Sequence, residues 1–334
     1  MDIHSRRYTG NKHKLTGWIK NLLIKNCTGC KSFFDVFGGT GAVTASVLDI
    51  YENITINDFL FSNEVIYRAF LCKDPYDKNK LNKIASLYNK IDKSKLDGNY
   101  VSQNFGNKYF SCNDAKLIGW IREDLEEKHL SKEITQREFD ILLASLLYSC
   151  DKKANTCGHY DAYIKRKTIA DVFTFSLISP IDTENKEINI YRKDANELVK
   201  AIKADIAFID PPYNSRQYSR FYHVLENITK WEKPELTGIA MKPPEENMSE
   251  YCRARAVTYF ADLINNLDVK YIAVTYSNTD DSKSYSSKNK ITLEQIKSIL
   301  ESKGETKIYK KFHRSFNGRT KSDGHKEFLF ITKV

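Results

Sequence analysis

The chain has 334 residues, which is enough for one large catalytic core together with an insertion or a second small domain. Its hydrophobic fraction of 41% permits a sizeable globular core, and no apolar run approaches the length that a membrane span requires. The first residues, 1–15, are basic and polar and lack the apolar stretch of a signal peptide, so we expect a cytoplasmic protein with no membrane partner.

The net charge of +9 is concentrated near the two ends of the sequence. Residues 1–31 contain seven Lys or Arg against one Asp, and residues 283–334 contain thirteen Lys or Arg against five Asp or Glu. The segment between them is net negative. Lys and Arg displace counterions from phosphates, so this distribution fits a polyanion partner, but it fits a solvated basic surface equally well.

The predicted elements begin with an alternation of strands and helices. Residues 31–41 start as a short buried strand and end in a glycine turn, and residues 42–51 have helix-forming character. A second strand is predicted at 54–58, and a helix at 63–71. This order is how an α/β nucleotide-binding sheet starts.

The composition changes at residue 74. Residues 74–185 are rich in Lys, Asn and Tyr, and two helices are predicted there, at 114–128 and 136–149. Apolar side chains of the second helix recur on one face. We interpret this region as a mostly helical insertion.

Strand-like patterns resume after the insertion. They lie at 188–191, 205–209, 271–277 and 328–332, with a helix predicted at 293–302. Continuous apolar strands that alternate with helices indicate a sheet covered on both faces. The sequence therefore predicts an α/β fold of the Rossmann-like kind, interrupted by the insertion.

Two motifs suggest a nucleoside site. The glycine turn DVFGGTG at 35–41 would let a ligand approach the backbone closely, although its spacing does not match dinucleotide or phosphate-binding loops. Asp58 ends the next strand, 19 residues after Gly39, where a carboxylate can accept ribose hydroxyls. A purely structural turn and a helix-capping Asp are the alternatives.

The third motif, DPPY at 210–213, follows a buried strand at the edge where α/β sheets bind ligands. The two prolines fix the backbone and orient the Asp210 carboxylate and the Pro211 carbonyl as two acceptors. Tyr213 adds a flat aromatic face. This set suits an exocyclic amino group on a planar base, and a rigid turn is the alternative.

Together these motifs resemble those of Dam-like (alpha-group) adenine methyltransferases, and YTGNKHKL at 8–15 looks like the first motif of that group. Residues 151–163, 210–218 and 222–228 are similar to the FokI-type subgroup of modification methyltransferases. The resemblance implies a Rossmann-like S-adenosylmethionine-dependent fold with an inserted target-recognition domain. The catalytic domain would comprise 1–73 and 186–334, and the target-recognition insertion 74–185.

The resemblance also implies roles for particular residues. Asp210, Pro211, Pro212 and Tyr213 would form the catalytic loop, which would hold a flipped adenine and methylate its N6. S-adenosylmethionine would contact the first motif, the glycine turn and the strand ends: Tyr8, Asn11, Lys12, Phe37, Gly38, Gly39, Thr40, Gly41, Asp58, Asp194, Ala195 and Asp210. Lys12 or Lys14 would lie near the cofactor's carboxylate, and Phe312 or Phe316 would flank the base. No metal is expected, because the sulfonium is already activated.

The expected partner is double-stranded DNA. Candidate contacts follow the catalytic loop or lie in the insertion: Arg216, Gln217, Tyr218, Lys165, Arg166 and Lys167. Each of these side chains has a structural alternative, in loop packing or at a solvated surface. The resemblance implies a monomer that modifies the site of a cognate restriction endonuclease without forming a stable complex with it.

Other functions remain open at this point. An N4-cytosine methyltransferase would use the same acceptor geometry, although such enzymes more often carry Ser where Asp210 stands. The large insertion disfavours an RNA adenine methyltransferase, and the intact motifs disfavour a non-catalytic DNA-binding subunit. A nicotinamide-dependent oxidoreductase would need a different glycine spacing.

Overall fold

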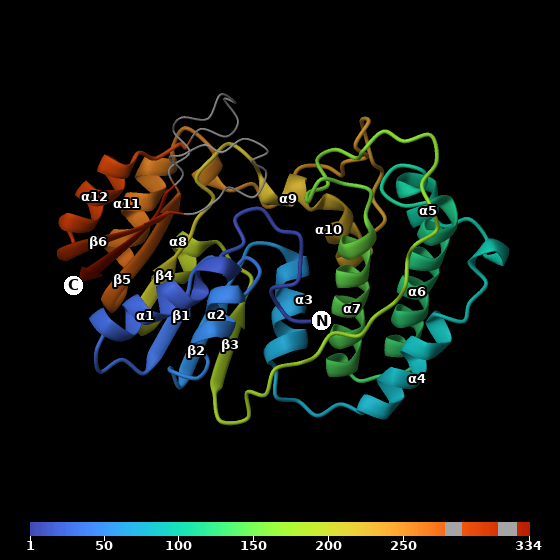
Figure 1. Ribbon diagram of the computed structural model, residues 1–334, viewed down its shortest axis with the longest axis horizontal. Helices are drawn as coiled ribbons and strands as arrows, with labels where there is room; N and C mark the ends of the chain where they lie inside the picture. The colour runs from blue at the N-terminus through green and yellow to red at the C-terminus, as the bar shows by residue number, and fades with distance from the viewer. Residues whose placement is uncertain (278–288, 313–325) are drawn as a thin grey trace. The chain divides into compact units, whose positions relative to one another are not determined.

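The structure of the protein is a computed structural model that describes residues 1–277, 289–312 and 326–334 (Figure 1). The chain forms two compact units, each assembled from separated stretches of sequence. The helical unit comprises residues 1–11, 60–184 and 219–246. The sheet unit comprises the described residues of 12–59, 185–218 and 247–334.

Within the described residues, the sheet unit contains one seven-stranded sheet of order β3-β2-β1-β4-β5-β7-β6. The strands β1 to β5 are parallel to one another, whereas β7 runs antiparallel to both of its neighbours, β5 and β6. Their bounds are β1 (Ser32–Asp35), β2 (Asn53–Asn57), β3 (Glu187–Tyr191), β4 (Lys203–Ile209), β5 (Asp268–Ser277), β6 (Glu305–Phe312) and β7 (Lys326–Lys333).

The order of the strands reverses at β1, which lies between β2 and β4 (Figure 1). Chain connections leave in opposite directions from this point, so the carboxyl ends of β1 and β4 lie at the position where α/β sheets generally bind ligands. Residues 35–41 follow β1 and residues 210–213 follow β4, so the topology brings two of the predicted motifs to this edge.

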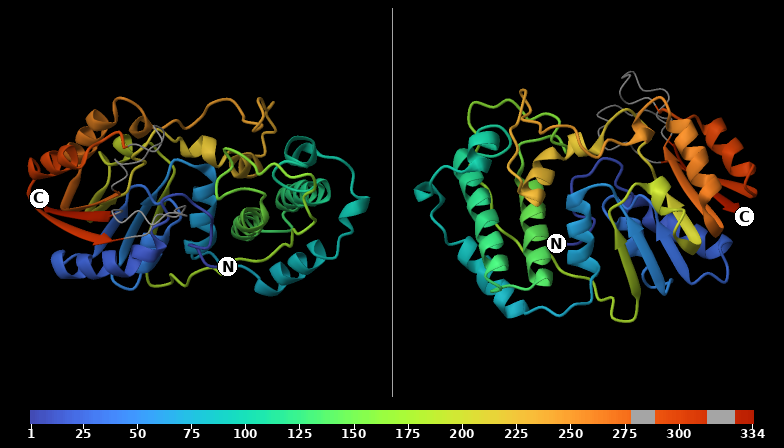
Figure 2. Two further views of the ribbon diagram at one scale, coloured as in Figure 1. Left: turned by 45° about the horizontal axis from the view of Figure 1, so that its top comes forward. Right: turned by 180° about the vertical axis from the view of Figure 1, so that it is seen from behind.

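Helices cover both faces of the sheet (Figures 1 and 2). Phe34 of β1 and Ile209 of β4 belong to a buried core with residues of the helices on the face seen from behind in Figure 2. Phe33 points to the other face, where it stacks on Tyr51 with ring centroids 5.3 Å apart. The helices are α8 (Ala195–Leu198), α11 (Ala256–Asn266) and α12 (Leu293–Glu301) on the first face, and α1 (Thr16–Asn26) and α2 (Ala42–Val47) on the second.

The helical unit is built around a central helix, α7, which is buried along most of its length. The helices α3, α6 and α10 pack against it. The bounds in this unit are α3 (Phe61–Leu71), α4 (Lys78–Tyr88), α5 (Tyr100–Phe105), α6 (Cys112–Leu130), α7 (Gln136–Lys153) and α10 (His223–Lys230), and the short α9 (Tyr218–Phe221) precedes α10.

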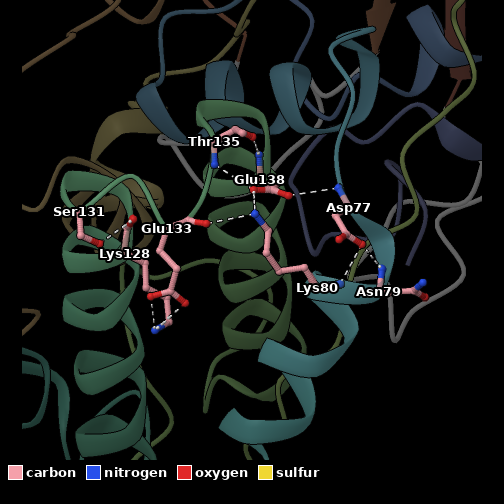
Figure 3. Close-up of polar contacts among 8 residues, drawn as sticks. All are labelled: Asp77, Asn79, Lys80, Lys128, Ser131, Glu133, Thr135 and Glu138. Carbon is pink, nitrogen blue, oxygen red and sulfur yellow. Dashed lines mark hydrogen bonds and ion pairs between the residues drawn. The ribbon is translucent and has the colours of Figure 1, made fainter.

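Side-chain caps determine where α4 and α7 begin (Figure 3). The Asp77 carboxylate accepts hydrogen bonds from the backbone N–H groups of Asn79 and Lys80, which starts α4. Thr135 and Glu138 form a reciprocal capping box that starts α7. Lys80 Nζ lies 2.5 Å from Glu138 Oε2, so the two helix starts are also joined to each other.

The α/β fold expected from the sequence is confirmed, and the two helices predicted at 114–128 and 136–149 lie within α6 and α7. The helices α1 and α11 and the edge strand β6 were not predicted from the sequence. Among the residues that the structure describes, none of the helices combines the length and the apolar character needed to span a membrane.

Candidate active site

Four aspartates stand at or just beyond the carboxyl ends of four neighbouring parallel strands. Asp35 ends β1 and Asp58 follows β2, while Asp194 lies shortly after β3 and Asp210 follows β4. Because these strands are adjacent and parallel, their carboxyl ends form a single edge of the sheet, and this edge is lined with acceptors.

The glycine turn after β1 has the backbone conformation that its sequence predicts. Gly39 and Gly41 have φ angles of +53° and +73°, a left-handed region that residues with a Cβ enter only at a cost. The Gly38 N–H donates to the Asn57 carbonyl at 2.8 Å, and the Gly39 N–H donates to Asp58 Oδ2 at 2.9 Å. The turn is therefore held against the end of β2, and Asp58 is one of the groups that hold it.

Asp35 is buried beneath this turn. Its Oδ2 accepts a hydrogen bond from the Thr44 hydroxyl at 2.7 Å. Its Oδ1 has no hydrogen-bond partner among the described residues. Burial raises the pKa of the Asp35 carboxyl to about 7, and the negative charges of Asp210 and Asp58 add to the increase.

Asp194 lies beyond β3 and begins the short helix α8. Its carboxylate accepts hydrogen bonds from the backbone N–H groups of Asn196 and Glu197. It also lines a cavity of about 470 Å³ together with Tyr259 and Asp262 of α11. Asp194 therefore caps a helix, and it also lines an open cavity of the sheet unit.

Asp210 is the centre of a buried polar cluster. Its Oδ2 lies 2.9 Å from Lys12 Nζ, and its Oδ1 accepts a hydrogen bond from the Thr275 hydroxyl at 2.7 Å. Lys12 Nζ also lies 3.2 Å from Glu327 Oε1. One lysine is therefore shared between two carboxylates, and the side chain of Asp210 is only 17% exposed.

The charges in this cluster have opposing effects on the ionisation of Asp210. Burial raises the pKa of Asp210, whereas the ammonium group of Lys12 lowers it, and the net direction is upward. For Lys12, burial works toward a lower pKa, but Asp210 and Glu327 outweigh it and raise the pKa above its ordinary value. Lys12 is therefore charged at neutral pH and favours the carboxylate form of its partner.

Tyr213, at the end of the DPPY loop, is buried and anchored at three places. Its hydroxyl donates to the backbone carbonyl of Thr275. Its ring packs edge-on against Tyr276, with centroids 5.1 Å apart, and its carbonyl accepts from the Lys290 N–H at 2.6 Å. The loop after β4 is therefore held in place by contacts with β5 and with Lys290.

The three residues predicted after the catalytic loop have different environments. Gln217 is buried, and its side-chain amide both donates to and accepts from the backbone of Ser249, at 2.9 and 2.7 Å. The Arg216 N–H donates to the Asn214 side chain at 3.0 Å, and Tyr218 begins α9. Gln217 therefore joins two segments of the sheet unit, which is the loop-packing role that the sequence left open for it.

The motif at 8–15 is divided between the two units. Tyr8 and Asn11 belong to the helical unit, and Lys12 belongs to the sheet unit. Tyr8 stacks on Tyr222 with centroids 4.7 Å apart, and the Asn11 side chain donates to the His4 carbonyl. Lys12 therefore lies beside Asp210 in the sheet unit, whereas Tyr8 and Asn11 make these contacts within the helical unit.

The remaining predicted residues lie on surfaces or outside the described chain. Lys165, Arg166 and Lys167 are exposed on a segment of the helical unit without regular secondary structure. Phe312, at the end of β6, is 70% exposed. Phe316 lies outside the described residues.

Three residues of this site were missed by the sequence analysis as individual candidates. Asp35 lies inside the first motif, and a polar residue in an otherwise apolar strand is the signal that could have identified it. Thr275 lies within the strand predicted at 271–277, and Glu327 directly precedes the strand predicted at 328–332, but the pairing of these strands is not encoded by a local pattern.

Comparison with known proteins identifies the family of this chain. The model of the D12 class N6 adenine-specific DNA methyltransferase family matches residues 8–299. The chain is 32% identical to the modification methylase LlaI of Lactococcus lactis subsp. lactis over 81% of its own length and 46% of that protein's. It is 28% identical to the type II methyltransferase M.NlaIII of Neisseria lactamica, over 97% of this chain and 98% of the relative.

A third relative is the type II methyltransferase M.FokI of Planomicrobium okeanokoites, 29% identical over 98% of this chain and 52% of that protein. The chain thus spans about half the length of LlaI and M.FokI, and nearly all of M.NlaIII. The family match over residues 8–299 includes the glycine turn, the DPPY loop and the strands β1 to β5 that position them. This chain therefore belongs to the D12 class of N6 adenine-specific DNA methyltransferases.

Proposed function

We propose that this chain transfers a methyl group from S-adenosylmethionine to N6 of an adenine that is flipped out of double-stranded DNA. The observation that carries the proposal is the position of the Asp210–Tyr213 loop, which follows β4 where the strand order reverses. The chain that carries this loop belongs to the D12 class. A carboxylate paired with a lysine is an acceptor in its ionised form, and an anchored aromatic ring beside it suits a planar base.

The residues around the glycine turn fit the proposed cofactor. A nucleoside carries hydroxyl and amino donors, and the acceptors at this edge of the sheet include Asp58 and Asp194. A sulfonium is cationic, and the carboxylates along this edge of the sheet contribute to a negative environment. When bound, S-adenosylmethionine supplies an activated methyl group. The residues that would hold it in the sheet unit are Lys12, Phe37, Gly38, Gly39, Thr40, Gly41, Asp58, Asp194 and Ala195.

The catalytic loop would act on the target adenine by positioning. The Asp210 carboxylate has about four acceptor sites, so two protein donors leave capacity for an amino hydrogen of the base. The Pro211 carbonyl would accept the second amino hydrogen. Two hydrogen bonds that hold the amino hydrogens out of the ring plane favour a more pyramidal N6. Its lone pair is then less delocalised into the ring and can attack the methyl group. Pro212 would keep the loop rigid, and Tyr213 would pack on the base.

We further propose that this chain is a Dam-like alpha-group enzyme of the FokI type, and the monomeric modification enzyme of a bacterial restriction–modification system. The similarity to M.FokI over 98% of this chain supports it. In this proposal residues 1–73 and 186–334 form the catalytic domain, and the insertion 74–185 recognises the target sequence. A cognate restriction endonuclease would act on the same site without forming a stable complex.

The proposed DNA contacts combine backbone binding and target reading. The exposed side chains of Lys165, Arg166 and Lys167 support a contact with phosphates or base edges. Arg216, Gln217 and Tyr218 follow the catalytic loop directly, so they would lie near the strand from which the base is extruded.

The deciding experiment is methylation of plasmid DNA by the purified protein with S-adenosylmethionine, read base by base by single-molecule sequencing. We expect N6-methyladenine at one short motif, and none with Asp210→Ala. Methylation of cytosine N4 would overturn the base assignment while leaving the positioning scheme in place. Cofactor binding without methylation of DNA would point to an RNA substrate or a non-catalytic subunit.

A further inference from the structure

Thr275 of β5 contacts both functional ends of the DPPY loop. Its hydroxyl donates to Asp210 Oδ1 at 2.7 Å, and its backbone carbonyl accepts the hydroxyl of Tyr213. Ile209 of β4 is paired in register with Val274 of β5, so the next positions on the two parallel strands are Asp210 and Thr275. Their contact therefore follows from strand pairing and does not depend on a flexible loop.

The position of Thr275 is itself fixed by the sheet. It is fully buried, and its strand pairs with β4 on one side and with β7 on the other, where Leu329 is its partner. A β-branched side chain in a strand has few accessible rotamers, so the hydroxyl has little freedom to leave Asp210. A group this constrained is suited to hold another side chain in one orientation.

We propose that Thr275 is a positioning residue for methyl transfer, because its hydroxyl orients the Asp210 carboxylate while its carbonyl fixes the Tyr213 ring. This inference rests on the proposed function. The amino acceptor and the stacking surface for the base are then set relative to each other by one residue of the sheet. Small displacements of aligned groups are costly, since an error of about 1 Å can reduce a rate by ~100-fold.

The hydroxyl also acts on the ionisation of Asp210. Among the residues that the structure describes, the charged and titratable groups that face Asp210 are Lys12, Glu327, Asp35 and Tyr213. Of its neighbours, Lys12 and the Thr275 hydroxyl favour the carboxylate form. Removal of the hydroxyl therefore raises the pKa of Asp210 further, and the acid limb of the rate profile moves to higher pH.

The experiment compares the purified wild-type protein with Thr275→Val, Thr275→Ser and a matched control, Thr332→Val. Thr332 is also fully buried in a strand of this sheet, but its hydroxyl pairs with Thr306 and not with the DPPY loop. Single-turnover methylation at saturating DNA and cofactor is measured from pH 5.5 to 9. Cofactor affinity is measured separately by calorimetry.

We expect Thr275→Val to lower the single-turnover rate by about tenfold or more, with cofactor affinity changed less than about twofold. Its acid limb moves to higher pH. Thr275→Ser retains most of the rate, and Thr332→Val matches the wild type. Wild-type rate and pH profile in Thr275→Val would overturn the inference, as would an equal loss in Thr332→Val. Wild-type protein that methylates nothing would instead overturn the proposed function.

A second variant keeps the test decisive if Thr275→Val does not fold. Tyr213→Phe removes the hydrogen bond to the Thr275 carbonyl and leaves the ring in place. We expect a slower single turnover at unchanged cofactor affinity, because the ring loses its fixed point. An unchanged single-turnover rate in folded Tyr213→Phe would show that the carbonyl of Thr275 does not position the ring, which overturns the inference.

Discussion

Lys12 Nζ lies 2.9 Å from Asp210 Oδ2 and 3.2 Å from Glu327 Oε1, so one ammonium group is shared by a largely buried carboxylate and an almost fully buried one. Asp210 follows β4, and Glu327 lies in β7, two strands away across β5. The lysine thus ties the catalytic loop to the antiparallel part of the sheet. It also supplies the charge that keeps Asp210 an acceptor despite its burial.

Removing this lysine charge should therefore be costly. We expect Lys12→Met, which preserves much of the side-chain volume, to destabilise the protein by about 3–5 kcal/mol, because two buried carboxylates lose their counterion. Denaturant unfolding measures this. Lys20→Met is the control, since Lys20 pairs with the exposed Asp49 and should cost about 1 kcal/mol or less. Equal losses of stability in the two variants would contradict this interpretation of the cluster.

Asp35 should make stability depend on pH in an unusual direction. Its folded pKa of about 7 lies above its ordinary value, so the folded state binds a proton more readily than the unfolded chain. This contribution is full at low pH and is lost as pH rises through 7. Asp35→Asn stays neutral, so its stability relative to wild type should increase by about 3 kcal/mol between pH 5 and pH 8. Urea unfolding at both pH values checks this, and a difference that is independent of pH would contradict it.

Gln217 should act mainly through the segment that it holds. Its amide makes two hydrogen bonds to the backbone of Ser249, so Gln217→Ala is expected to expose that segment to limited proteolysis. Arg216→Ala should leave the cleavage pattern unchanged and weaken DNA binding. Weaker DNA binding by Gln217→Ala with wild-type protease resistance would instead favour a direct contact between Gln217 and DNA.

The exposed basic segment should contribute to the salt dependence of DNA binding. If Lys165, Arg166 and Lys167 bind phosphates, replacing all three by Ala should make the slope of log K against log salt less steep, by about 0.9 for each phosphate that is no longer neutralised. Fluorescence anisotropy with a duplex at several salt concentrations measures this slope. Lys203→Ala serves as a control, because Lys203 pairs with Asp268 in the sheet unit. An unchanged slope in the triple variant would exclude these residues from phosphate binding.

The sequence was most informative where local patterns determine the structure. The strand before Asp210 is a continuous apolar run, and the strand before Asp58 has isoleucines at the alternate positions 54 and 56, so the carboxyl ends of both could be located from the residues alone. The edge strand β6 was missed because an edge strand need not be apolar: Lys307, Lys310 and Lys311 are exposed along it.

The rest of the site depends on pairing between distant strands. Thr275 lies beside Asp210 only because Val274 is in register with Ile209, and Glu327 reaches Lys12 only because β7 pairs with β5. No short-range pattern encodes these registers. The pairing of Gln217 with Ser249 is likewise a contact between segments that are 32 residues apart.

The position of β7 between β5 and β6 has a consequence for folding during synthesis. β1 pairs with β4, which lies more than 160 residues later, and β5 gains its second neighbour only when residues 326–333 are available. Such non-local pairing folds slowly compared with local helix contacts. A ribosome-bound chain that has completed the helical unit still lacks Glu327 and the partner strand of Thr275. The catalytic end of the sheet would therefore be among the last parts of the nascent protein to become ordered.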